Sequence, residues 1–178
     1  MPLKIFSQTD EKPLLKYSSW LLLQAIPSPV FYHDIKNEKE KINFGFRWQI
    51  IPLNYSFSAN KYVSNFQSFF IKPVRRFAGS AEIFIQPEIA LKDFNNGNNN
   101  NFWIAGGTRV IFPITDYGEV LSASVGVKYN FHKNISDGYD NYPGIEGGLY
   151  FMGGLGVQAN YNFNKFNQIN LGLFIKYY

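Results

Sequence analysis

The chain has 178 residues, of which 46% are hydrophobic, 19% aromatic and only 17% charged, and its formal net charge is +4. Charge is scarce, because a soluble domain of average composition carries about 25% charged residues. The absence of cysteine excludes disulfide scaffolds, thiolate metal sites and cysteine nucleophiles, two histidines exclude a histidine-rich metal centre, and no basic stretch interleaved with aromatics indicates nucleic-acid binding.

Residues 1–17 are predicted to form an N-terminal extension. They are polar and interrupted by Pro2 and Pro13, and they lack the basic region, apolar stretch and small-residue cleavage site of a signal peptide. No later stretch approaches ~18 consecutive apolar residues, which excludes a transmembrane helix. The rest of the chain, residues 18–178, shows no break in composition and is predicted to be a single domain.

Apolar and polar residues alternate along most of this domain, which is the pattern of β-strands that bury one face. Between Ile42 and Ile50 the apolar residues fall at even positions, and after Pro52 the alternation shifts by one residue, which predicts a β-bulge. The segments between strands are rich in Asn, Asp, Gly and Pro, as turns require. Eight strands are predicted, near residues 18–26, 42–57, 66–74, 79–89, 102–112, 121–131, 149–163 and 169–177.

The two faces of these strands differ in a way that indicates which one is internal. The polar face carries Gly, Ser, Asn and Gln with a few single charges, which suits the narrow interior of an eight-stranded barrel. The apolar face carries aromatic residues toward the strand ends, as the two membrane–water interfaces select. The fold class predicted is therefore all-β, an eight-stranded antiparallel up-and-down transmembrane β-barrel. A soluble ligand-binding barrel of the lipocalin type is the alternative outside the membrane.

In this pattern, residues 18–178 resemble the small outer-membrane β-barrels of Gram-negative bacteria, the group that includes OmpX and the membrane domain of OmpA. Members of that group end in an aromatic residue that the barrel-insertion machinery recognises, and Tyr178 matches it, although the alternating apolar set ends at Tyr177. The resemblance implies an outer-membrane location, with membrane lipid and that machinery as partners. The frequent use of Asn, Phe, Tyr, Ile and Lys resembles that of proteins encoded by AT-rich genomes, such as those of the Bacteroidota.

A charge network is predicted inside the barrel, because charged residues recur on the polar face. An unpaired buried charge is costly, so each must be paired or hydrated. Glu82 is expected to pair with Arg47 or Arg109, and the network is expected to hold the barrel together, with a gated pore or an anion site as the alternative. Its members are Arg47, Lys72, Glu82, Glu88, Arg109 and Lys128, with Glu146 and Lys176 also assigned inward.

Two histidines are the only candidates for acid–base chemistry. His33 is followed by Asp34, and His132 precedes Ser136 and Asp137, all in predicted loops. Some barrels of this size, PagP and PagL, are lipid A acyltransferases or deacylases, but the PagL-type His-x-Ser spacing is absent here. We therefore expect no catalytic residue, no cofactor and no metal, and an outer-membrane lipid-modifying enzyme stays the alternative.

The predicted outer wall offers a candidate interaction surface. Small outward residues beside bulky ones let another membrane element approach closely. This candidate wall consists of Gly147, Leu149, Phe151, Gly153 and Leu155. The expected function is a structural or interaction role in the outer membrane, by docking onto a larger outer-membrane protein complex. The longer connections, around Asn60, Asn98 and Ser136, are expected on the same side of the membrane as the termini.

Overall fold

A computed structural model describes residues 18, 22, 24–36, 39–57, 66–68, 79–91, 101–115, 120–134, 138–151, 155–164 and 167–175. The fold is all-β, and among the described residues no helix is long and apolar enough to cross a membrane. The strands are β1 (Ser28–Lys36), β2 (Lys39–Arg47), β3 (Ile50–Ser56), β4 (Phe66–Ser68), β5 (Ser80–Ala90), β6 (Phe102–Thr115), β7 (Leu121–Asn134), β8 (Gly138–Phe151), β9 (Leu155–Asn162) and β10 (Asn167–Ile175).

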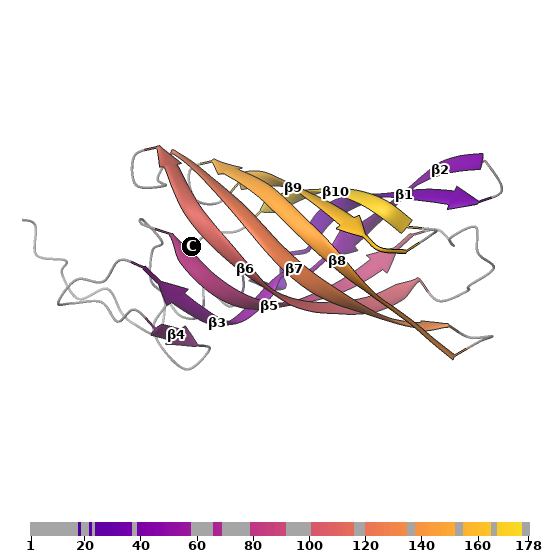
Figure 1. The fold of residues 1–178 in the computed structure, drawn as a ribbon, viewed down its shortest axis with the longest axis horizontal. Coiled ribbons are helices and arrows are strands. Elements are labelled where there is room, and N and C mark those ends of the chain that lie inside the picture. Colours follow the sequence, from indigo (N-terminus) through magenta and orange to yellow (C-terminus); the bar gives the residue numbers. More distant parts are fainter. Residues whose placement is uncertain are drawn as a thin grey trace, which may run out of the picture.

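The strands form a closed antiparallel barrel (Figure 1). From β5 to β10 each strand pairs with its neighbour in sequence, and β1 closes the ring by pairing with β10, with Val30 opposite Gly172. On its other side β1 pairs with β2, and β2 pairs with β5. The ring therefore has eight strand positions, each of which we call a stave. β2 and β3 follow one another in a single stave, and β4 is an extra strand outside the ring.

The predicted β-bulge lies near the start of β3. Both strands pair with β5, and the register shifts between Ile50 and Leu53, on either side of Pro52. Proline cannot donate to the ladder, so it is placed where regular pairing is already interrupted. Beyond the bulge, the outer edge of β3 pairs with β4. This short strand covers an edge that would otherwise present free backbone groups.

Alternation along each stave separates an inner from an outer face, as the sequence predicts. On β5, for example, Glu82, Phe84 and Gln86 are buried while Ile83 and Ile85 are exposed. The inner face is mostly polar, and its largest apolar cluster is small, consisting of Val30, Tyr32, Ala90 and Trp103.

Four predicted segments differ from the structure. The described residues of the first predicted strand, residues 18–26, include helical backbone at Ser18, Leu22, Gln24 and Ala25, and the first strand is instead β1. The turn-rich segments 26–40 and 132–143 lie largely in strands, and predicted strand 149–163 is the hairpin of β8 and β9. Of the weak strand 66–74, the described part is β4, and the rest lies outside the described residues.

These differences change which connections share an end of the barrel. The connections between β1 and β2, β5 and β6, β7 and β8, and β9 and β10 lie opposite the end where β1 begins and β10 stops. Figure 1 shows the β1–β2 and β7–β8 hairpins at the end away from the C-terminus. The connections around Asn98 and Ser136 therefore belong to that end, and the expectation that they share a side with the termini is wrong. Of these three connections, the one around Asn60, between β3 and β5, lies on the side of the termini.

Candidate functional site: a charged interior and an apolar outer wall

The described interior contains balanced charge. Six charged side chains are buried inside the barrel, each at most 4% exposed, and they comprise three cations and three carboxylates, while Lys41 near the start of β2 lies on the same face but is partly exposed. Alternation fixes their direction, because each stands between outward apolar neighbours on its strand. The six are Arg47 on β2, Glu82 and Glu88 on β5, Arg109 on β6, Lys128 on β7 and Glu146 on β8.

Glu88 is the centre of one cluster. Its carboxylate lies 3.0 Å from Nη2 of Arg47, which stands directly opposite in the β2–β5 register, and 3.4 Å from Nζ of Lys128. The hydroxyl of Tyr32 donates to the same carboxylate at 2.9 Å. Because charge-assisted hydrogen bonds are stronger than neutral ones, this carboxylate ties three strands besides its own together.

Arg109 is the centre of the second cluster. Its guanidinium lies 3.5 Å from Glu82 and 3.2 Å from Glu146, and it stands 4.6 Å from the ring centroid of Phe84. Gly126 lies between Arg109 and Glu146 in the cross-strand register. A Cβ at Gly126 would lie 2.6 Å from Cβ of Arg109 and 3.1 Å from Cγ of Glu146, so glycine is what allows this ion pair to close across β7.

Two glutamines connect the clusters. Nη1 of Arg47 donates to Gln158 at 3.2 Å, Nε2 of Gln49 donates to the same oxygen at 2.7 Å, and Arg109 donates to Gln49. Cations and carboxylates thus belong to one network that spans the interior. Such a network is stable only when its members are satisfied, since an uncompensated charge in a low-dielectric interior is costly.

Aromatic side chains lie on both sides of the charged layer. Toward the end opposite the termini, the ring of Trp103 is 5.1 Å from Tyr32 and 5.6 Å from His132. Toward the other end, Tyr150 is 4.9 Å from Phe174, and its hydroxyl is 2.8 Å from Oγ of Ser124. Side chains therefore fill the interior along its length, as expected for eight strands. The described residues hold no group of three or more side chains suited to a metal ion.

The predicted network is brought together in large part. Glu82 pairs with Arg109, as predicted, whereas Arg47 pairs with Glu88 instead. Lys72, Lys176 and the C-terminal Tyr178 lie outside the described residues. Sequence reasoning did not single out Gln49 and Gln158, although alternation had placed both on the polar face. It also missed Tyr32, because its strand had been interpreted as a loop.

The two histidines do not share a site. Both lie on strands rather than in loops, which corrects the prediction, with His33 on β1 and His132 on β7. His33 stands at an outward position of β1, whereas His132 is buried beside Trp103 inside the barrel. Residues 136–137, the predicted neighbours of His132, lie outside the described residues.

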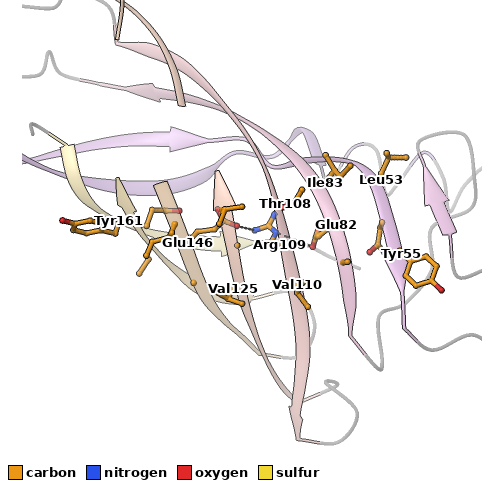
Figure 2. A pocket seen from close by; sticks show the side chains of 18 of the residues that line it. Leu53, Tyr55, Glu82, Ile83, Thr108, Arg109, Val110, Val125, Glu146 and Tyr161 are labelled. Carbon is orange, nitrogen blue, oxygen red and sulfur yellow. Dashed lines mark ion pairs between the residues drawn. The ribbon is translucent and has the colours of Figure 1, made fainter. Parts of the chain in front are cut away.

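The outer wall is apolar and carries a shallow groove. Among strand residues whose burial is described, no Asp, Glu, Lys or Arg side chain faces outward. The groove has a volume of about 1050 Å³ and crosses the wall from β3 to β10, where Ile169 lines it. Figure 2 shows Tyr161 and Tyr55 at its two ends, with Val125 and Val110 between them. Cross-strand register aligns a row of small residues along it, which are Ala81, Val110, Val125, Gly147 and Ala159.

The candidate interaction wall meets this groove at Gly147. A Cβ at Gly147 would have no heavy atom nearer than 3.7 Å, so the wall is open there. Leu149, Phe151 and Leu155 are exposed and continue the apolar surface from Gly147 toward the end of the barrel that carries the termini. Gly153 lies outside the described residues.

In comparisons of the chain with models of protein families, with curated proteins and with solved structures, none matches. The class that the geometry defines is a closed eight-stranded barrel with a filled, charge-balanced interior and an apolar outer wall.

Proposed function

We propose that the protein is an integral β-barrel of a bacterial outer membrane with a structural or interaction role. The observation that carries the proposal is the inverted polarity of the barrel, with charge inside and an uncharged apolar wall outside. In water such a wall would be costly, because exposed contiguous apolar surface on soluble proteins is limited to a few hundred Å². In a bilayer the same wall is favourable, and closure satisfies the backbone groups that lipid cannot.

The distribution of aromatic residues on the wall supports this proposal. Tyr129 and Phe131 make an edge-to-face contact at the end of β7, and Tyr161 and Phe163 make another at the end of β9. Tyr55 and Phe57 form a similar pair toward the end of the termini. Between these ends the exposed residues are mainly aliphatic, an arrangement typical of outer-membrane barrels, whose apolar band lies between two aromatic girdles.

An interaction role is proposed because side chains of the described residues occupy the interior at several levels. The ion-paired clusters and the aromatic layers fill it, whereas a lipocalin-type barrel would need an apolar internal cavity. The groove across the wall provides the docking surface. Small residues such as Ala81, Gly147 and Ala159 allow close van der Waals approach by another membrane element of an outer-membrane complex. Bilayer lipid and, during biogenesis, the barrel-insertion machinery are the other proposed partners, as the resemblance to the OmpX and OmpA group implies.

An arginine scan of the wall tests the membrane location. Val127, 59% exposed near the middle of β7, would be replaced by Arg, with Thr115→Arg at the end of β6 as the matched control. A lipid-facing midpoint site should cost about 2–4 kcal/mol, and a site near the interface about 0–1 kcal/mol. Folding into vesicles is measured from heat-modifiable gel mobility. Equal folding of both variants, or a monomeric protein in water without detergent, would overturn the proposal.

Cross-linking from the groove tests the docking role. The chain has no cysteine, so a photo-cross-linker can be attached at Gly147→Cys, with Leu173→Cys on β10 as a control outside the groove. In native membranes we expect one adduct of defined mass in high yield from the groove position only. A monomer without an adduct at either position would contradict a docking role.

A further inference from the structure

The segment that precedes β1 contacts the barrel where β2 ends and β3 begins, beside the bulge. Its described residues Leu22, Gln24 and Ala25 have helical backbone. Oε1 of Gln24 accepts a hydrogen bond from the backbone N–H of Ile51 at 3.2 Å, and the carbonyl of Ala25 accepts one from the indole of Trp48 at 3.0 Å. Two independent hydrogen bonds therefore fix this segment to the barrel wall.

These contacts lie where the ring of strands is incomplete. The β1 ladder begins at Ser28 opposite Arg47 and at Val30 opposite Gly172, whereas β3 and β10 each continue beyond those points. Between the start of β1 and the end of the barrel that carries the termini, β1 therefore does not bridge β3 and β10. We call this gap in the ladder the seam. β4 covers the β3 edge of the seam from Leu53 to Tyr55, so among the described residues the uncovered part lies before Leu53, and it needs hydrogen-bond partners, particularly in a medium without water. Gln24 supplies one of them, because it bonds to an N–H at the bulge itself.

The opposite side of the segment is apolar and uncovered. Leu22 is 70% exposed and Ile26 46% exposed, whereas Gln24 is 7% exposed. Leu22 and Gln24 have helical backbone, and in a helix a residue two positions on points nearly the opposite way. Leu22 and Ile26 thus face away from the barrel while Gln24 faces it. They belong to the longest apolar run of the chain, residues 20–26, which is interrupted only by Gln24.

We propose that the described residues of this segment, Leu22 and 24–26, form a membrane-contacting strap, which covers the β3 edge at Ile51 and turns Leu22 and Ile26 toward the lipid. The inference rests on the proposed membrane location of the barrel. Its support is continuity, because Trp48, which binds the segment, belongs to the outward apolar row of β2 that includes Ile42 and Phe44. Lipid acyl chains are the one occupant whose chemistry matches both the wall and the strap.

Nitroxide labels at single cysteines test the strap in the full chain reconstituted in phosphatidylcholine vesicles. Leu22→Cys is compared with Val127→Cys on the outer wall and with Ser124→Cys, which is buried inside the barrel. Power-saturation measurements with oxygen and with a water-soluble nickel chelate report lipid or water contact. We expect the label at Leu22 to match that at Val127, with preferential access to oxygen. The label at Ser124 should have little access to either reagent.

The outcomes separate the strap from the barrel's location. Lipid contact at Val127 with water contact at Leu22 would overturn the strap and leave the membrane location standing. Water contact at both would overturn both. As a second measurement, Gln24→Ala combined with Trp48→Phe should shift the Leu22 label toward the nickel reagent. An unchanged Leu22 label in this variant would show that these two hydrogen bonds do not hold the strap.

Discussion

Glu88→Gln is expected to be among the most destabilising single changes in the barrel. The substitution keeps the size of the side chain but removes the charge that compensates Arg47 at 3.0 Å and Lys128 at 3.4 Å. Both cations are at most 4% exposed, so neither can recover its hydration. Removing one partner of a buried ion pair costs about 3–5 kcal/mol. We expect that loss in the free energy of unfolding, measured by urea titration of the folded protein in vesicles.

A double-mutant cycle separates the ion pair from side-chain packing. Glu88→Gln combined with Lys128→Met restores charge balance, because Arg47 and Arg109 then face Glu82 and Glu146. The double variant should be more stable than the sum of the single losses predicts, by about 1–3 kcal/mol.

Asn43→Leu is the matched control for these variants. The amide of Asn43 is fully buried on β2 and has no hydrogen-bond partner in the described structure, so its replacement should cost little or stabilise the barrel. The network interpretation would be refuted if Glu88→Gln unfolded at the same urea concentration as the wild type, or if the cycle showed no coupling.

Gly126→Ala should lose about 2–3 kcal/mol, because its Cβ would lie 2.6 Å from a neighbouring side-chain atom, whereas Gly147→Ala should change stability by less than about 0.5 kcal/mol. Equal urea midpoints for the two variants would contradict the assigned directions of these glycines. Brominated lipid should quench the fluorescence of Trp48 on the outer wall more strongly than that of Trp103 inside the barrel, when each is the single tryptophan left after Trp20 and the other are replaced by Phe. Equal quenching would contradict the assignment of the two faces.

Local alternation predicted the faces of the staves well, since it depends only on neighbours along one strand. The shift after Pro52 was informative for the same reason, because a proline beside a change of phase has few structural explanations in a strand. The hairpin of β8 and β9 was missed because an odd number of residues separates the end of β8 at Phe151 from the start of β9 at Leu155. Phe151 and Leu155 therefore stay in phase, and the apolar period continues unbroken through the turn.

The first stave was missed because its two faces resemble one another. On β1, Val30 and Tyr32 point inward and pack in the small apolar cluster, while Phe31 points outward. With apolar residues on both faces no alternation appears, and the prolines at its start indicated a turn instead. Hydrophobicity alone also predicted a strand at residues 18–26, although helical backbone occurs there.

The sequence alone could not predict which charged residues pair inside the barrel, because the pairing depends on the register of the strands. Arg47 meets Glu88 because the β2–β5 register places the two residues directly opposite each other, before the register shifts between Ile50 and Leu53. Register at that level depends on the whole ring and not on the residues around Arg47. Glu82 stands directly opposite Arg109 on β5 and β6, as Glu88 does opposite Arg47 on β5 and β2.

The pairing of β1 with β10 sets the order in which the barrel can be completed. Val30 and Gly172 belong to the first and last staves, and the bonds from Arg47 and Gln49 to Gln158 span 111 and 109 residues of sequence. Contacts so distant along the chain form slowly, because a long loop must be closed before they stabilise anything. Until β10 pairs with β1, the growing sheet has two open edges. Arg47 then remains hydrated, because its hydrogen bond to Gln158 has not yet formed. Closure of the ring and completion of the internal network are therefore one late event, and a chain that lacks β10 would retain adhesive edges on both sides.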